Sequence, residues 1–232
     1  MPARGRRAGT PTPMLDPLPV AVAAIQGAIL LVLAEGVRRG NVAAAVNALA
    51  AFAVAVLPFV LGATTALAVA PGLTLWLAVA GLLHAIGMLG LYDSVPRWDT
   101  VTHFVSASVV AALCYASVLV AEPSGWGTAA ATTILLTFAL GLWWELVELV
   151  ARELGEEFDV EPVLVHYGPR DTLLDLIVDV LGAVAIVAVD VRAFVPVVSP
   201  FLGPDTPFLR WAVIALAVGF AALTLLFAGL RY

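Results

Sequence analysis

Three groups of ionisable side chains stand out because they lie inside or beside long apolar stretches. They combine carboxylates and an imidazole at helical spacing: Asp99 and His103, then Glu145 and Glu148, then Asp171, Asp175 and Asp179. Neighbours within each group are three or four residues apart, so each group occupies one face of a helix. Each charged carboxylate near the centre of a bilayer costs about 2.5–3.5 kcal/mol, and such residues mark functional sites by default. The three groups therefore predict a site that holds positive charge.

Carboxylates together with an imidazole suit a divalent cation such as Mg²⁺, Mn²⁺, Zn²⁺ or Fe²⁺. We expect the metal ligands among Asp99, His103, Glu145, Asp171, Asp175 and Asp179. In this scheme the ion activates a water molecule, and Glu145 or Glu148 acts as the general base. Arg97 and Arg170 precede two of the groups, and we expect them to hold a phosphate together with the helix N-termini.

Helix capping is an alternative role for two of the aspartates. Asp99 could be the N-cap of its helix, and Thr172 with Asp175 fits a capping box. Capping does not account for Glu145, because the helix dipole disfavours an acid near a helix C-terminus. Glu145 is therefore the strongest functional candidate among the carboxylates.

Other side chains near the groups also have two interpretations. Glu148 and Arg152 are spaced for an ion pair along one helix. A lone histidine such as His84 is a secondary candidate ligand, but on an apolar helix it more often packs with a hydrogen bond. His166 and Tyr167 lie in an acidic connection, where they could form a lid or be solvated.

The composition indicates which elements position these groups. Of 232 residues, 62% are apolar and 12% charged, with a mean hydropathy of +1.04, whereas soluble domains have about 45–50% and 25%. This balance excludes a nucleic-acid-binding domain, and the single cysteine, Cys114, excludes an intrachain disulfide. Stretches of about 20 apolar residues suffice to cross a bilayer, and seven occur: 18–37, 42–61, 73–91, 100–121, 126–150, 172–190 and 208–230.

The predicted fold is thus an all-α, polytopic transmembrane helical bundle with about seven spans. We expect residues 1–17 to be a flexible tail and 18–232 a single transmembrane domain, with the motifs in a core of about 73–192. The connections after the first, third and fifth spans hold Arg38, Arg39, Arg97, Arg152 and Arg170, and those after the second and fourth hold no arginine. The positive-inside rule then predicts a multi-pass protein of the cell membrane with these connections in the cytoplasm. All three ionisable groups fall on that side.

The motifs also carry a family resemblance. Its residues are Asp99-x-x-x-His103-Phe104, Trp144-Glu145-x-x-Glu148 and Asp171-Thr172-x-x-Asp175, followed by Asp179 and Gly182-Ala183 and preceded by His84-Ala-Ile-Gly87. Over roughly residues 38–192 this set resembles the YjdF-type family of prokaryotic integral membrane proteins. The resemblance implies a small polytopic membrane protein of uncharacterised activity. The order of motifs is also similar to VanZ-like membrane proteins, although this chain has Glu148 where that group has a glutamine.

Three functions stay open from the sequence. The favoured one is a metal-dependent hydrolase or transferase that acts on a lipid or isoprenoid headgroup, with membrane lipids and no nucleic acid as partners. The second is a proton- or cation-coupled transporter, for which Gln26, Asn47 and Asp190 are the obvious path residues, but no inverted repeat supports it. The third is a structural or assembly protein whose acids are neutralised and capped.

Overall fold

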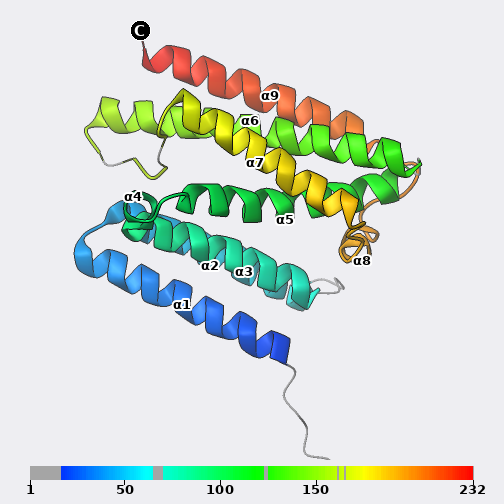
Figure 1. Cartoon of the computed structure of the whole chain (residues 1–232), viewed down its shortest axis with the longest axis horizontal. Helices are drawn as coiled ribbons and strands as arrows, with labels where there is room; N and C mark the ends of the chain where they lie inside the picture. Colours follow the sequence, from blue (N-terminus) through cyan, green and yellow to red (C-terminus); the bar gives the residue numbers. More distant parts are fainter. Residues whose placement is uncertain (1–16, 65–69, 123–124, 161, 165, 232) are drawn as a thin grey trace, which may run out of the picture.

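The computed structural model describes residues 17–64, 70–122, 125–160, 162–164 and 166–231, and the regular elements in these ranges are helices (Figure 1). They are α1 (Pro17–Arg39), α2 (Val42–Thr64), α3 (Pro71–Ile86), the π-helical turn η1 (Gly87–Leu91), α4 (Tyr92–Ser94), α5 (Trp98–Ala121), α6 (Trp126–Phe158), α7 (Pro169–Ala188), α8 (Val195–Val198) and α9 (Phe208–Leu230). The all-α prediction is confirmed. The predicted tail, residues 1–17, lies outside the described residues except for Pro17, which begins α1.

Within the described residues, six helices are long and apolar enough to cross a membrane: α1, α2, the run Pro71–Ser94, α5, α6 and α9. Large apolar side chains cover their outer faces; for example, Leu31 is 73% exposed and Leu225 74% exposed. Helix α9 has no buried residue at all. Outward apolar faces of this kind suit contact with lipid chains rather than water, as expected of a membrane protein.

The seventh predicted span, residues 172–190, corresponds to α7 but is not among these six, because Asp171, Asp175 and Asp179 crowd its first three turns. Helix α7 nevertheless runs along α5 and α6 from one end of the bundle to the other (Figure 1). It begins where α6 ends, and the chain then passes through α8 to the start of α9 at the opposite end. We call the end that holds the start of α7 the site end; it lies on the left in Figure 1.

The helix that carries Glu145 and Glu148 is longer than its apolar stretch. The sequence predicted spans at 126–150 and 172–190, and thus a connection of about twenty residues between them. In the structure α6 continues to Phe158, and the connection to α7 is residues 159–168. The added turns are rich in charged helix-forming residues, and Arg152 pairs with Glu156 one turn later at 3.6 Å. Asp159 then ends the helix in the left-handed conformation (φ 52°).

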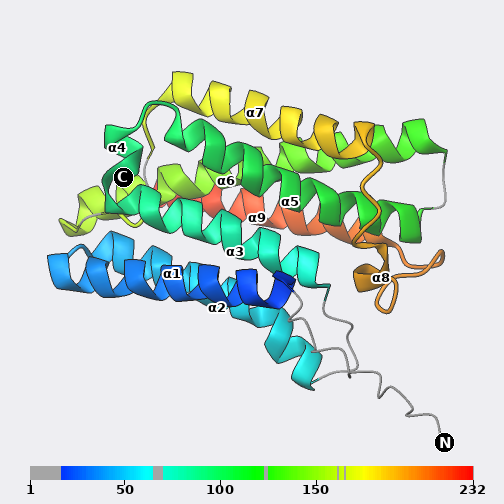
Figure 2. The ribbon, with the colours of Figure 1, turned by 60° about the horizontal axis from the view of Figure 1, so that its bottom comes forward.

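The helices pack in two groups that meet along α3 and α5 (Figures 1 and 2). Helices α1, α2 and α3 contact one another, as do α5, α6 and α7, while α9 lies against α6 on the far side from α1. Alanines fill the first interface: Ala48, Ala55, Ala78 and Ala85 have no exposed surface. Small residues let helix backbones approach closely, which is how membrane helices gain packing energy.

Helices α5 and α7 approach each other closely at Gly182, and the site depends on this contact. A Cβ added at Gly182 would lie 2.9 Å from Ser108 Oγ and 3.2 Å from the Phe104 carbonyl oxygen. Since Ser108 already donates a hydrogen bond of 2.7 Å to that carbonyl, neither atom can move aside freely. Glycine at this position therefore sets the spacing that brings the aspartates of α7 to His103.

We expect Gly182→Ala to destabilise the protein by about 1–3 kcal/mol, because it overpacks a tight interface. Thermal unfolding of the purified protein in detergent measures this as a lower melting temperature. The matched control is Gly27→Ala, at a helical glycine of α1 with no atom within 4 Å of the added Cβ. Equal melting temperatures for the two variants would contradict the role of Gly182.

Candidate functional site

The three ionisable groups predicted from the sequence meet at the site end of the bundle. Asp99 and His103 lie in the first turns of α5, Glu145 and Glu148 in the second half of α6, and Asp175 in the second turn of α7. Glu145, Glu148, Asp175 and Asp179 are buried, with 3–7% of their surface exposed. The burial of four carboxylates in one helical bundle makes this end chemically unlike the rest of the molecule.

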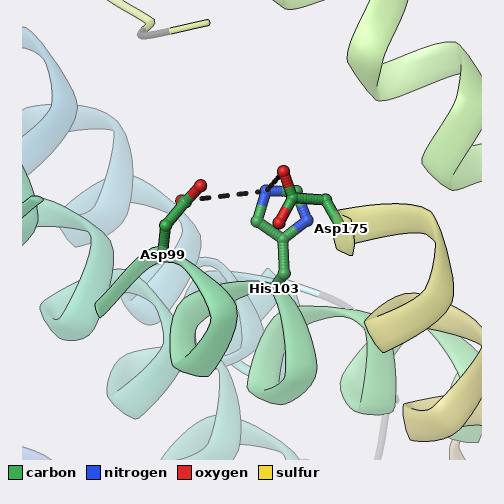
Figure 3. Close-up of side chains that lie close together, drawn as sticks. All are labelled: Asp99, His103 and Asp175. Carbon is green, nitrogen blue, oxygen red and sulfur yellow. Dashed lines mark ion pairs between the residues drawn. The ribbon is translucent and has the colours of Figure 1, made fainter. Parts of the chain in front are cut away.

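His103 is the centre of one cluster, which we call the aspartate–histidine cluster and define as Asp99, His103, Asp175 and Asp179. Figure 3 shows the first three of these residues, with His103 between the two aspartates. His103 Nε2 lies 3.9 Å from Asp99 Oδ1 and 4.0 Å from Asp175 Oδ2. His103 Nδ1 lies 3.3 Å from Asp179 Oδ1. A proton donated from Nδ1 to Asp179 leaves the Nε2 lone pair facing the other two carboxylates, which is how a second carboxylate orients a metal-binding histidine.

This cluster could hold a metal ion. One ligand atom from each of Asp99, His103 and Asp175 lies within 4.8 Å of the others. Gly141 of α6 gives Asp179 room, because a Cβ added there would collide with the Asp179 carboxylate. The aspartate–histidine cluster thus depends on close contacts of α7 with both α5 and α6.

A second group, which we call the glutamate–histidine cluster, contains Glu145, Glu148 and His166. Their ligand atoms also lie within 4.8 Å of one another. The sequence predicted Glu145 and Glu148 to share one pocket with the aspartates and considered His166 only as part of a lid or a solvated loop. The structure divides the ligands into two sets, and it adds His166 from the connection between α6 and α7. No sequence spacing indicated this, since the position of His166 depends on how that connection folds back.

Some predicted site residues lie outside both clusters. Asp171 is half-buried at the start of α7 and interacts electrostatically with Asp99 and Asp175, but it joins neither ligand set. Arg97 and Arg170, the predicted phosphate-binding residues, are exposed at the N-terminal ends of α5 and α7 and do not line the cavity described below.

The capping interpretation of the aspartates is wrong. The N-cap of α5 is Arg97, in the left-handed conformation (φ 64°), and Asp99 lies two residues inside the helix. The N-cap of α7 is Gly168, with no side-chain cap, so Thr172 and Asp175 form no capping box. The reason is that each helix begins before the apolar span predicted for it, α5 at Trp98 and α7 at Pro169, so that both aspartates lie inside a helix.

The predicted ion pair between Glu148 and Arg152 does not form either. Glu148 faces the bundle interior and accepts a hydrogen bond of 2.8 Å from Trp144 Nε1. Arg152 instead pairs with Glu153 at 3.1 Å and Glu156 at 3.6 Å. The buried acids of α6 are therefore not neutralised by the arginine next in line on their own helix.

His84 is a hydrogen-bonded packing residue that also borders the site. Its Nε2 lies 3.0 Å from Asn47 Oδ1, and its Nδ1 lies 2.5 Å from the Tyr92 hydroxyl. The amide group of Asn47 donates to the carbonyl oxygens of Ala43 and Val163, so its Oδ1 accepts from His84. The histidine must then accept the Tyr92 proton at Nδ1, and both ring nitrogens are engaged.

A cavity of about 580 Å³ adjoins both clusters. At the site end its wall includes Asp99, His103, Glu148 and Asp179, and farther along the helices it is formed by apolar residues of α2, α3, α5 and α6 such as Leu77, Val110 and Leu140. Four lining residues are exposed: Ala50 and Val54 of α2, Trp144 of α6, and Tyr167 of the connection before α7. They mark an opening on the side of the bundle.

The residues expected along a transport path do not form one. Gln26 donates a hydrogen bond to the Ala55 carbonyl oxygen, and of the three only Asn47 lines the cavity. Asp190 lies at the opposite end, where Tyr115 and Arg192 donate hydrogen bonds to it. Chiefly the bond from Arg192 holds the pKa of the Asp190 carboxyl below its ordinary value.

The comparisons with known proteins give a family. The family described as "Predicted membrane protein (DUF2238)" matches residues 20–195, about three quarters of the chain. The chain belongs to this family. No curated protein and no solved structure matches it.

Removal of the Tyr92 hydroxyl tests the hydrogen-bond network around His84. Tyr92→Phe leaves the buried Nδ1 of His84 without its donor, which we expect to lower the free energy of unfolding by about 1–3 kcal/mol. The control is Tyr167→Phe, because the Tyr167 hydroxyl donates to Asp93 at an exposed position, at 3.3 Å. If thermal unfolding in detergent shows the same small effect for both variants, the network around His84 is not a stabilising one.

Proposed function

We propose that this member of the DUF2238 family binds a divalent cation in its aspartate–histidine cluster and acts as a membrane-embedded hydrolase or transferase on a lipid or isoprenoid headgroup. One observation carries the proposal: potential metal ligands and a long apolar wall belong to the same cavity. Asp99 and His103 line its polar end, and the remainder suits a hydrocarbon chain.

The donor set supports a cation. Two carboxylates, Asp99 and Asp175, balance the charge of a divalent ion, and a neutral imidazole adds a nitrogen ligand. Three protein ligands leave coordination positions for water and for an oxygen of the substrate, as in catalytic rather than structural sites. Mg²⁺, Mn²⁺ and Zn²⁺ all accept such ligands.

The cavity supports an amphiphilic substrate. Its volume of about 580 Å³ lies within the range of about 300–1,000 Å³ that is typical of small-molecule sites. The exposed residues Ala50, Val54 and Trp144 border its opening on the flank of the bundle. A lipid could enter there from the bilayer with its chain along α2 and α3 and its headgroup beside His103.

The chemistry that fits is cleavage or transfer at a phosphate ester. The oxygen of water bonds to phosphorus while the bond from phosphorus to the lipid oxygen breaks. Glu148 lines the cavity and is not a ligand in the aspartate–histidine cluster, so it is placed to take the proton from water and return it to the leaving oxygen. In a transfer reaction an acceptor hydroxyl replaces the water.

The proposed location is the cell membrane, with the site end toward the cytoplasm. Arg38 and Arg39 end α1, Arg97 is the N-cap of α5, and Arg152 and Arg170 lie in the last turns of α6 and the first turn of α7. Arginines near membrane-span ends favour the cytoplasmic side. The resemblance of the motifs to YjdF-type and VanZ-like proteins is consistent with this placement and stays a prediction.

Metal content is the first test. We expect Asp175→Asn to lose about one equivalent of bound metal relative to the wild type, because the substitution removes a charged ligand. Elemental mass spectrometry on detergent-purified protein measures the ratio, with Asp190→Asn, at the opposite end, as the control. If His103 is a protonated imidazolium, its positive charge compensates the same aspartates without a metal ion. A wild type that contains no stoichiometric metal would support that arrangement and overturn the proposal.

Occupancy of the cavity is the second test. Ala80 lines the apolar wall, so we expect Ala80→Phe to reduce the lipid that copurifies with the protein several-fold. Ala53→Phe is the matched control, because Ala53 is exposed on α2 and does not line the cavity. Extraction and mass spectrometry of bound lipids give the comparison. If the two variants retain equal lipid, the cavity is not the binding site.

A further inference from the structure

We infer that the glutamate–histidine cluster is a second cation site, so that the site end binds two divalent cations. The ligands are Glu145, Glu148 and His166, each of which offers one atom within 4.8 Å of the others. This inference rests on the proposed function, in which the aspartate–histidine cluster holds the first ion. The two proposed sets of metal ligands share no residue and can be tested separately.

The main observation is the state of Glu145. Its side chain is 3% exposed, and both carboxylate oxygens are buried without a hydrogen-bond partner. The Thr172 side chain is close enough to act as a weak hydrogen-bond donor to Glu145, but neither carboxylate oxygen has a donor at ordinary hydrogen-bond distance and angle. Among the described residues, the only other buried side-chain atom without a partner is Arg152 Nε. A buried charged carboxylate with no donor is strongly destabilising, so Glu145 needs either a proton of its own or a cation beside it.

Glu148 and His166 complete the set. Glu148 is 7% exposed and accepts the Trp144 hydrogen bond at Oε1, which leaves Oε2 available to an ion. His166 lies in the connection between α6 and α7, three residues after Val163, whose carbonyl oxygen accepts a hydrogen bond of 2.6 Å from Asn47 Nδ2. This connection therefore contacts α2 close to the position of the histidine.

The charge of the cluster also calls for a cation. Two carboxylates and a neutral imidazole match a divalent ion, while Arg152 is engaged by Glu153 and Glu156. The cluster is next to the first one, since Glu145 interacts electrostatically with His103 and Asp179. One cation in the aspartate–histidine cluster would leave the glutamates uncompensated.

A second cation refines the chemistry of the site. Paired divalent ions are a recurrent device for displacement at phosphorus, because they stabilise both the attacking and the leaving oxygen. Such a pair suits the phosphate-bearing lipid of the proposed function. Glu148 would serve as a ligand and no longer as a general base, and the two roles differ in a measurable way. A base can be replaced without loss of metal, whereas a ligand cannot.

The test loads the full-length protein in detergent with Mn²⁺, removes free ion, and counts manganese per chain by elemental mass spectrometry. We expect about two ions in the wild type and about one in each of Glu145→Gln, Glu148→Gln, His166→Ala and Asp175→Asn. Glu157→Gln is the matched control, because Glu157 is an exposed glutamate of the same helix, and it should keep two. Size-exclusion profiles establish that each variant is folded, and His166→Ala alters only a connection outside the helices.

The outcomes separate the two claims. One ion that is lost in Asp175→Asn but kept in Glu145→Gln and His166→Ala overturns the second site and leaves the proposed function intact. One ion that is kept in Asp175→Asn but lost in Glu145→Gln and His166→Ala overturns the assignment of the first site and supports the second. A wild type that binds no Mn²⁺ overturns both.

Discussion

Carboxylates buried among apolar helices need compensating positive charge or donors, and this requirement organises the site end of the bundle. Asp175 and Asp179 can be buried because His103 lies between them and Asp99. That geometry in turn requires α7 to approach α5 more closely than most side chains permit. Gly182 allows the approach on the side of α5, and Gly141 makes room for Asp179 on the side of α6. The close packing of α5, α6 and α7 therefore allows His103 and the aspartates to be buried together.

The same requirement distinguishes the two clusters. In the aspartate–histidine cluster, the imidazole contacts all three aspartates, so part of their charge is compensated within the protein. In the other cluster, Trp144 satisfies one oxygen of Glu148, whereas both oxygens of Glu145 are without a donor. A purely structural role accounts for a buried acid whose oxygens accept hydrogen bonds better than for one whose oxygens do not. An apolar residue in place of a buried acid without donors would make the protein more stable, so a structural role alone would not preserve the acid. Glu145 is therefore the acid whose burial the contacts within the protein explain least.

The fold was largely predictable from the sequence, because a bilayer requires apolar stretches of nearly fixed length. The meeting of the acidic groups at one end was predictable too, since alternate helices begin and end on the same side. Local details were not. The end of α6 at Phe158 and the early starts of α5 and α7 depend on charged residues that carry no hydropathy signal. The division into two clusters, with His166 as a member of the second, depends on tertiary contacts such as that of Asn47 with Val163.

The position of the cavity links these local features to a function. An acidic cluster that faced only water could be a solvated surface, and an apolar cavity alone could be filled by lipid without consequence. Here one wall carries both kinds of residue: His103 and Glu148 at one end, and Val54 and Leu77 at the other. A molecule that fills this space must itself be polar at one end and apolar along the rest, as a membrane lipid is. The proposed cations would then lie beside the polar end of such a molecule, where a phosphate ester of its headgroup could react.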